Sequence, residues 1–362
     1  MAKPSVLIFH RPAAAGEPSL VHELAAVRLE LAERQSRLLE RAGAAGATFI
    51  DEWRDGLTFG EVLAEVAPAR GGVIVFGSGA VPRLNRSDAR RLVEVAATGK
   101  RRALTNNRFS SDIVAIGRAM LADLPPLPSD NALPRWLEER AEFVVDELPG
   151  KQRLALDLDT PLDVALAALG PGAAGWLVDA ARDRAWTVPR FDKLRLLAAD
   201  PHAELLVFGR SGSTTLRWLE RNVRCRVRFL AEERGMRASS PLAIDAPRQT
   251  EATRRAGPRA SFGMLLDDRG PSALAAIVDE LADGAIIDSR VLLAHRLGAD
   301  ESGWPSPADR FASDLLLTDQ VEDSWLGELT RAAAEARPPI LLGGHSLVGP
   351  GVPILLGRAG RA

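Results

Sequence analysis

Residues 153–169 read RLALDLDTPLDVALAAL, and this stretch predicts how the first half of the chain folds. Leucines recur at every second position before the aspartates, as in a strand, and an apolar helical pattern follows Pro161. Further strand and helix patterns alternate along the whole chain, which favours mainly parallel sheets flanked by helices. We therefore expect an α/β fold.

Two aspartates at the end of this expected strand are candidate metal ligands. In a strand, Asp157 and Asp159 would point the same way, ~6.6 Å apart along the chain. Carboxylates placed in this way can hold one divalent cation together with the phosphates of a nucleotide. A structural alternative is a helix start, with Thr160 as N-cap, Pro161 in the first turn and Asp163 completing a capping box. The helix start leaves Asp157 and Asp159 unexplained, so both interpretations stay open.

The composition indicates a globular protein and argues against several partner classes. The chain has 362 residues, 46% hydrophobic and 26% charged, with a net charge of −2, which suits two domains. A near-neutral charge gives no electrostatic reason to expect nucleic acid or a membrane surface as a partner. Cys225 is the one cysteine, which excludes an intrachain disulfide and favours a reducing cytoplasm. No signal-peptide core and no membrane-spanning window is found.

The chain divides into two halves that are both predicted to be α/β. In the first half, strands are expected at 5–10, 48–51, 72–76, 102–105, 143–146 and 153–158. Helices are expected there at 19–42, 60–66, 88–97 (capped by Ser87), 113–121, 133–140 and from 161 onward. The Gly- and Pro-rich residues 169–175 indicate a domain boundary, so we predict domains at 1–170 and 171–362.

The second half is predicted to be Rossmann-like. Strands are expected at 205–208, 225–230, 285–288 and 339–342, with helices at 214–222 and 273–282 and a polar surface loop at 240–258. A phosphate cradle is predicted where a strand runs into a helix, formed by Gly209, Arg210, Ser211 and Ser213. Gly344 and His345 end the last strand, where a histidine can act as general base or phosphate ligand. Glu232 follows a neighbouring strand and is a candidate base. The structural alternatives are a solvated turn for Glu232 and a structural role for His345.

Two polar turns in the first half are candidate nucleotide contacts. The turn at Ser78 and Gly79 follows a strand, and its backbone amides can receive an anion, unless it is a plain strand-to-helix turn. The second turn brings together amide, guanidinium and carboxylate groups that suit a ribose, base or phosphate. Its candidate residues are Asn106, Asn107, Arg108 and Asp112. An Asx turn with a helix cap would explain the same residues.

Three stretches together resemble a known family across roughly residues 1–170. They are SVLIFH at 5–10, GGVIVFGSGAVPRLNRSDARRLVEV at 71–95 and ALDLDTPLDVALA at 155–167. They look like the nucleotidyltransferase-like domains of glycosyltransferase-A type, which include the molybdenum-cofactor and phospholactate guanylyltransferases. The resemblance implies that Asp157 and Asp159 hold Mg²⁺. It also implies transfer of a nucleotidyl group from a nucleoside triphosphate to a phosphorylated small molecule.

The chain departs from this family at two places. The family has a glycine-rich loop with Arg and Lys after the first strand, whereas residues 10–18 read HRPAAAGEP, with Arg11 and one glycine to meet the phosphates. The family also places a metal-binding aspartate after its middle strand, where this chain has Gly79 or a neighbour. Nucleotidyl transfer depends on positioned charge and metal. These departures leave open whether the protein is an enzyme, with Asp112 as a candidate replacement carboxylate.

Two other functions therefore remain open. The first is a binding protein for nucleotides or phosphate esters that performs no catalysis. The second is a phosphosugar enzyme centred on the second half, because residues 208–215 faintly resemble the Ser/Thr loop of sugar-isomerase-type domains. In that enzyme Glu232 or Glu233 would act as the base.

Overall fold

The computed structural model describes residues 3–51, 56–127, 129–150, 152–170, 172–186, 188, 190–232 and 259–357. The described residues form two α/β units, one up to Asp159 and the other from Thr160 onward. Each unit has its own sheet. The expected α/β class with mainly parallel sheets flanked by helices is therefore confirmed. None of the helices in the described part of the chain combines the length and the apolar character needed to cross a bilayer.

The first unit is built on a six-stranded sheet with the order β2-β1-β3-β5-β4-β6. Its strands are β1 (Ser5–Phe9), β2 (Ala47–Ile50), β3 (Val73–Gly77), β4 (Arg102–Thr105), β5 (Ile113–Ile116) and β6 (Val144–Glu147). β5 runs antiparallel to its two neighbours, and the other pairs are parallel. The carboxyl ends of β1, β3 and β4 therefore lie at the same edge of the sheet.

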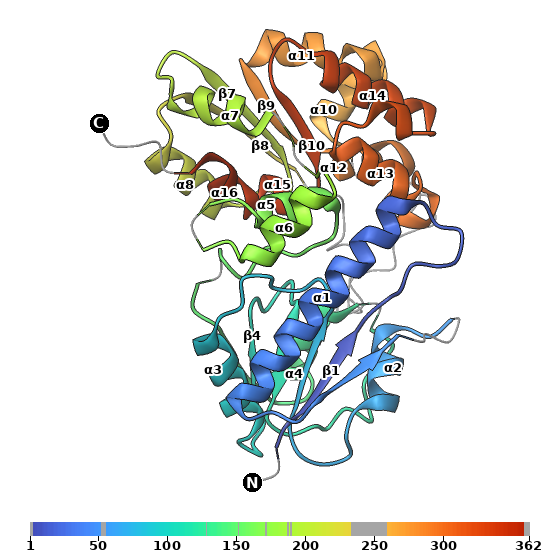
Figure 1. Ribbon diagram of the computed structural model, residues 1–362, viewed down its shortest axis with the longest axis vertical. Coiled ribbons are helices and arrows are strands. Elements are labelled where there is room, and N and C mark those ends of the chain that lie inside the picture. The colour runs from blue at the N-terminus through green and yellow to red at the C-terminus, as the bar shows by residue number, and fades with distance from the viewer. Residues whose placement is uncertain are drawn as a thin grey trace. The chain divides into compact units, whose positions relative to one another are not determined.

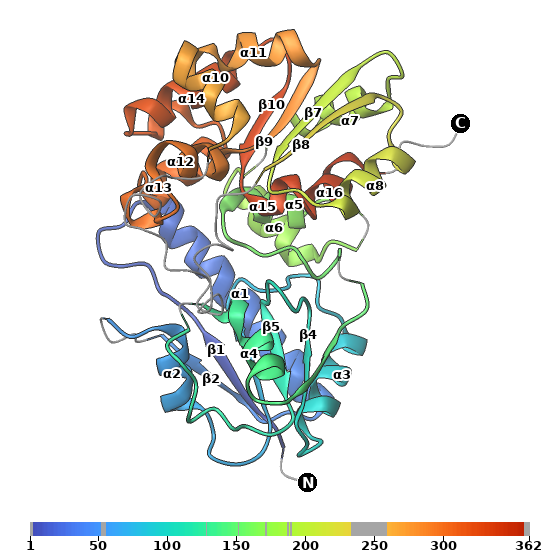
Figure 2. The same ribbon diagram turned by 180° about the vertical axis from the view of Figure 1, so that it is seen from behind.

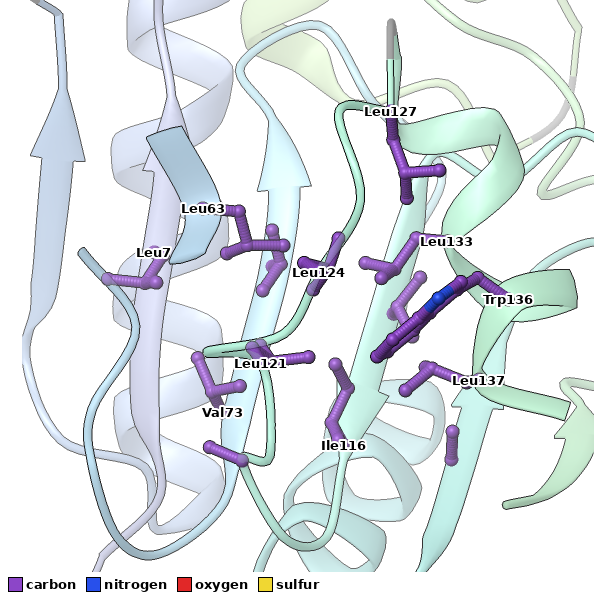
Figure 3. Close-up of a cluster of buried hydrophobic side chains, with 14 of the residues drawn as sticks. Leu7, Leu63, Val73, Ile116, Leu121, Leu124, Leu127, Leu133, Trp136 and Leu137 are labelled. Carbon is purple, nitrogen blue, oxygen red and sulfur yellow. The ribbon is translucent and has the colours of Figure 1, made fainter. Parts of the chain in front are cut away.

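Helices cover both faces of this sheet. They are α1 (Ser19–Ala42), α2 (Phe59–Val66), α3 (Arg86–Ala96), the 3₁₀ turn η1 (Asp130–Ala132) and α4 (Leu133–Glu139). α1 and α3 lie on one face, and α2 and α4 on the other (Figures 1 and 2). The side chains of each pair contribute to a separate core on that face. Figure 3 shows the core on the face covered by α2 and α4, in which Leu124 of a connecting loop lies between Leu63 of α2 and Leu133 of α4.

Two expected elements of the first unit are wrong. The helix expected at 113–121 is instead the strand β5, whose four apolar residues are all buried. A short, continuous apolar run has no periodicity that separates a buried strand from a buried helix, and the sheet decided the outcome. The strand expected at 153–158 does not form, although Leu154, Leu156 and Leu158 are fully buried. The alternation of leucines correctly indicated burial, but turns bury these side chains without strand pairing.

The cap of α3 also differs from the expectation. Asn85, and not Ser87, is the N-cap, because its side chain accepts the amides of Ser87 and Asp88 at 2.8 and 3.0 Å. The Asp88 carboxylate in turn accepts the Asn85 backbone amide at 3.0 Å, which completes a capping box. The helix therefore begins at Arg86, two residues before the expected start.

The second unit contains a four-stranded parallel sheet with the order β10-β9-β7-β8. Its strands are β7 (Glu204–Gly209), β8 (Arg226–Ala231), β9 (Gly284–Asp288) and β10 (Ile340–Gly343). Its helices are α5 (Pro161–Ala167), α6 (Gly175–Asp183), α7 (Arg190–Ala199), α8 (Ser213–Asn222), α10 (Ser261–Arg269), α11 (Leu274–Leu281), α12 (Ser289–Leu297), α13 (Pro307–Asp314), α14 (Ser324–Glu335), α15 (His345–Val348) and α16 (Gly351–Leu356). Three 3₁₀ turns connect them, namely η3 (Pro271–Ala273), η4 (Glu301–Gly303) and η5 (Thr318–Gln320). The loop expected at 240–258 lies outside the described residues.

The division between the units precedes α5, whereas the expected boundary followed it. The side chains of Leu162 and Leu166 on α5 approach Gly343 and Gly351, which belong to the second unit. Both leucines are fully buried. α5 therefore belongs to the core of the second unit, and the Gly- and Pro-rich stretch after it is an internal connection.

Candidate functional site

Polar residues follow three strands at the carboxyl edge of the first sheet. His10 follows β1, Ser78 follows β3 and Asn106 follows β4, and all three are buried. Phe9 is paired with Gly77 in the sheet, so the next residues, His10 and Ser78, meet, and the imidazole Nδ1 lies 3.0 Å from Ser78 Oγ. Desolvation, and then the positive charge of Arg28, lower the pKa of His10. A neutral imidazole at this position is thus favoured.

Asn106 holds two loops together at this edge. Its Nδ2 donates to Asp112 Oδ2 at 2.6 Å and to the Leu154 carbonyl at 2.9 Å. Its Oδ1 accepts the backbone amides of Asp112 and Ile113 at 3.0 and 3.3 Å. The side-chain amide uses both ends in these bonds, so it fixes the Asp112 carboxylate in place.

Gly79 allows the segment with Asp157 to approach the turn after β3. The Leu158 amide donates to the Gly79 carbonyl at 3.0 Å. A Cβ atom at Gly79 would lie 2.8 Å from Arg28 Nε, 2.9 Å from the Leu158 carbonyl and 3.2 Å from Asp157 Oδ1. Real Cβ atoms essentially never come so close to backbone oxygen, and only glycine fits here. Gly79 stands where the resembled family has its metal-binding aspartate, and this position is next to the Asp157 carboxylate and the Arg28 guanidinium.

Four carboxylates lie within one another's electrostatic field at this edge. We call them the carboxylate cluster, and its members are Asp112, Asp130, Asp157 and Asp159. Desolvation and then Asp159 raise the pKa of Asp157 to about 8, and desolvation, with a smaller effect of Asp159, raises the pKa of Asp130 to about 6. Desolvation followed by the charge of Asp157 raises the pKa of Asp112 well above its ordinary value. Arg28 acts in the opposite direction on Asp157 and Asp130.

The cluster could supply part of a magnesium site. Over the described residues, no group of three or more His, Cys, Asp or Glu side chains is arranged to hold a metal ion. Mg²⁺ commonly binds through one or two carboxylates, with the remaining ligands coming from water and substrate phosphates. Asp157 and Asp159 are oxygen donors of the kind that such a shared site uses, but the strand that was expected to align them does not form.

Three other residues predicted to contact the nucleotide, Arg108, Asn107 and Arg11, do not join the carboxylate cluster. Arg108 Nη2 donates to the Val145 carbonyl at 2.8 Å, and its Nη1 pairs with Glu138 at 3.0 Å. Asn107 Oδ1 accepts the Phe109 amide at 3.0 Å, which is the Asx turn considered as the alternative. Arg11 is exposed. These three residues hold or flank the loops, and the polar groups directed into the site come from other positions.

Two residues of the site were missed from the sequence. Arg28 lies on α1 in line with the buried Leu24 and Ala32, four positions away on either side. A charged residue inside such a buried row was a readable signal, because arginine is rarely placed there without a purpose. Asp130 is the first residue of the 3₁₀ turn η1 before α4, and no local pattern distinguished it from an ordinary turn residue.

The second unit brings together several of its predicted residues at the carboxyl ends of β7, β9 and β10. Arg210 Nε donates to the fully buried Asp288 at 2.9 Å, and the Arg210 carbonyl lies 2.7 Å from His345 Nδ1. Ser211 Oγ donates to the Val348 carbonyl at 2.6 Å. Gly209 has a φ of +124°, and a Cβ there would meet Asp288 at 2.2 Å. The contacts of Arg210 and Ser211 thus hold loops together, beside Gly344 and an exposed His345.

Two further predicted residues lie nearby in the chain. Glu232 accepts the Ser261 amide through both carboxylate oxygens, at 3.0 and 3.1 Å, and so anchors the start of α10. Ser213 is exposed at the start of α8. Glu233, the other candidate base, lies outside the described residues.

Comparisons with known proteins provide no family for this chain. No family model matches it, and no curated protein matches it. Among solved structures, Rv0371c from Mycobacterium tuberculosis H37Rv is similar at 17% sequence identity over 41% of this chain and 89% of that one. Its TM-score is 0.25, a similarity too weak to assign a family.

Proposed function

We propose that the first unit is a nucleotidyltransferase-like domain. It would bind a nucleoside triphosphate with Mg²⁺ and transfer the nucleotidyl group to a phosphorylated small molecule. The observation that carries the proposal is the carboxylate cluster next to Arg28 at the carboxyl edge of the sheet. The resemblance of residues 155–167 to the family's Asp-containing element supports the same assignment of Asp157 and Asp159 as metal ligands.

The residues of this edge have separate tasks in the proposed reaction. A Mg²⁺ ion at Asp157 and Asp159 would neutralise charge on the phosphates, which is the main requirement of phosphoryl-type transfer. The Leu158–Gly79 backbone bond holds the Asp157 segment against the turn after β3. Asn106 keeps Asp112 directed into the cluster. The Ser78 amide donates to the Phe9 carbonyl at 2.9 Å, so in this turn the Gly79 amide is the one that would approach a phosphate.

The second unit would bind the phosphorylated acceptor. Its candidate contacts are the exposed Ser213 at the start of α8 and the exposed His345 after β10, with Gly209, Arg210, Ser211 and Gly344 forming the surrounding loops. A helix start and a glycine turn both present backbone amides to an anion. Glu232 is less suited to act as a base, since both of its oxygens accept the Ser261 amide.

The second candidate function is nucleotide or phosphate-ester binding without transfer. Two observations favour binding without transfer over the transferase. The loop at 10–18 has one glycine and no lysine, and Arg108 is bound to Val145 and Glu138. A domain with this loop could keep a binding site and lose the groups that stabilise a transferring phosphate.

Calorimetric titration of nucleoside triphosphates, with and without Mg²⁺, tests the proposal. We expect binding that requires Mg²⁺ and that weakens at least about tenfold in Asp159→Asn, because the variant removes one metal ligand. Asp183→Asn, at an exposed position of α6, is the matched control and should bind normally.

Other results would identify the alternatives. Nucleotide binding that does not depend on Mg²⁺ or on Asp159 would favour the non-catalytic binding protein. Binding of a phosphosugar alone, unaffected by Asp159→Asn, would favour the phosphosugar enzyme. Absence of any nucleotide binding by the wild-type chain would refute both nucleotide-based functions.

A further inference from the structure

Arg28 occupies an unusual position for a charged residue. It lies between the buried Leu24 and Ala32 on the row of α1 that faces the core, and is itself half-buried. Placing a guanidinium in such a row is costly unless the charge and its hydrogen-bond donors are satisfied. An alanine or leucine would continue the row at no such cost, so packing alone does not explain an arginine here.

The guanidinium is directed towards the carboxyl edge of the sheet. Its Nε approaches within 2.8 Å of the position that a Cβ atom at Gly79 would occupy, close to Asp157 Oδ1. Its positive charge acts on His10 at the end of β1 and on Asp130 and Asp157 of the carboxylate cluster. Three segments distant in the sequence thus surround this one side chain.

The Nε donor of Arg28 has no partner among the described residues. This atom is buried from solvent, and its hydrogen is donated to no acceptor in the part of the chain that the structure describes. If Arg28 served only to neutralise the cluster, its planar donor set would be expected to bond a carboxylate directly, since such pairs are strong and directional. The electrostatic effect without this bond indicates that the fork is arranged for another anion.

We infer that Arg28 binds the phosphates of the nucleotide, in place of the charged loop that the chain lacks after β1. The inference rests on the proposed function, because it takes this edge as the nucleotide site. The loop at 10–18 has one glycine and an exposed Arg11, so it provides little for a phosphate. Arg28 supplies a positive charge from a helix, next to the carboxylates that would hold the metal. A guanidinium fork matches phosphate oxygens, and a polyphosphate is the ligand class it selects.

The test compares phosphate binding and metal binding in the same variants. Inorganic tripolyphosphate and a nucleoside triphosphate are titrated by calorimetry, and Mn²⁺ alone is titrated separately. In Arg28→Gln we expect both phosphate ligands to bind at least about tenfold more weakly, while Mn²⁺ binds equally well or more tightly. The metal result follows because the variant removes a positive charge next to the carboxylates. Arg34→Gln, an exposed pair partner of Glu30 on the same helix, is the matched control.

A second variant protects the test against misfolding. Arg28→Lys keeps the charge but removes the planar fork, and we expect it to lose at least about threefold in tripolyphosphate affinity. If circular dichroism shows that Arg28→Gln does not fold, the tripolyphosphate affinity of Arg28→Lys tests the inference instead. Unchanged phosphate affinity in the folded variants, with tighter Mn²⁺ binding, would overturn the inference and leave Arg28 as a neutralising residue.

The two proposals fail in distinguishable ways. If Asp159→Asn abolishes nucleotide binding while Arg28→Gln and Arg28→Lys bind normally, the nucleotide site stands and the role of Arg28 is refuted. If tripolyphosphate binds through Arg28 but no nucleotide does, the phosphate role stands and the proposed function fails. If the wild-type chain binds neither ligand, both are refuted.

Discussion

The carboxyl edge of the first sheet depends on one residue that has no side chain. Gly79 permits Arg28, Leu158 and Asp157 to meet at the turn after β3. Its sequence context, a glycine after a strand, predicted a turn that can receive an anion, and not a close approach to Arg28, Leu158 and Asp157. The reason for glycine at this position is the close approach of a distant segment, which no local pattern contains.

At this scale we predict that Gly79→Ala is destabilising. Its methyl group would lie 2.9 Å from the Leu158 carbonyl, so the backbone of that segment must move. We expect a loss of about 1–3 kcal/mol in the free energy of unfolding, measured by urea denaturation. Gly77→Ala, two residues earlier with no atom within 4 Å of its Cβ, should change stability by less than about 0.5 kcal/mol. Equal effects of the two substitutions would contradict this account of the turn.

At the scale of elements, hydrogen bonding at helix ends decided details that composition did not. Asn85 and Ser87 are both good N-cap residues, and Ser87 was expected to start α3. Asn85 is the N-cap because its side-chain oxygen accepts two backbone amides of the first turn. The Asp88 carboxylate accepts the Asn85 backbone amide. The choice depends on where the chain leaves β3, which sets the start of the helix.

This choice yields a direct comparison of two neighbouring residues. Asn85→Ala should cost about 1 kcal/mol of unfolding free energy, because two amides lose their acceptor. Ser87→Ala should have an effect of less than about 0.5 kcal/mol, since Ser87 is exposed in the first turn. Thermal or urea unfolding measures both effects. A larger loss of unfolding free energy in Ser87→Ala than in Asn85→Ala would indicate that Ser87 is the N-cap after all.

At the scale of the molecule, the two units have separate cores, and α5 belongs to the second. Leu162 and Leu166 are fully buried near Gly343 and Gly351. The Gly- and Pro-rich stretch after α5 suggested the boundary because such residues commonly mark linkers. Burial of an apolar helix outweighed this local signal, since the helix gains more free energy in a core than in a linker.

The assignment of α5 can be tested by hydrogen–deuterium exchange on the full chain. Leu162→Ala should cost about 2–5 kcal/mol, because it leaves a cavity in the core of the second unit. Exchange should then increase in α5, α6 and α16, while β1 and β3 of the first unit keep their protection. Leu196→Ala, at a side chain that is 74% exposed, should leave both patterns unchanged. Increased exchange in β1 or β3 after Leu162→Ala would place α5 in the first unit instead.

The sequence by itself determined the α/β class, the long helix α1 and nearly all strands, because hydrophobic periodicity reports burial locally. It also singled out Asp157, Asp159 and Asn106, whose polar groups follow strands or expected strands in the chain. Only the tertiary structure placed Arg28 and Asp130 beside them, made a strand of residues 113–116 and left 153–158 without strand pairing. These features depend on contacts between segments far apart in the chain, and local residue patterns carry no information about which distant segments meet.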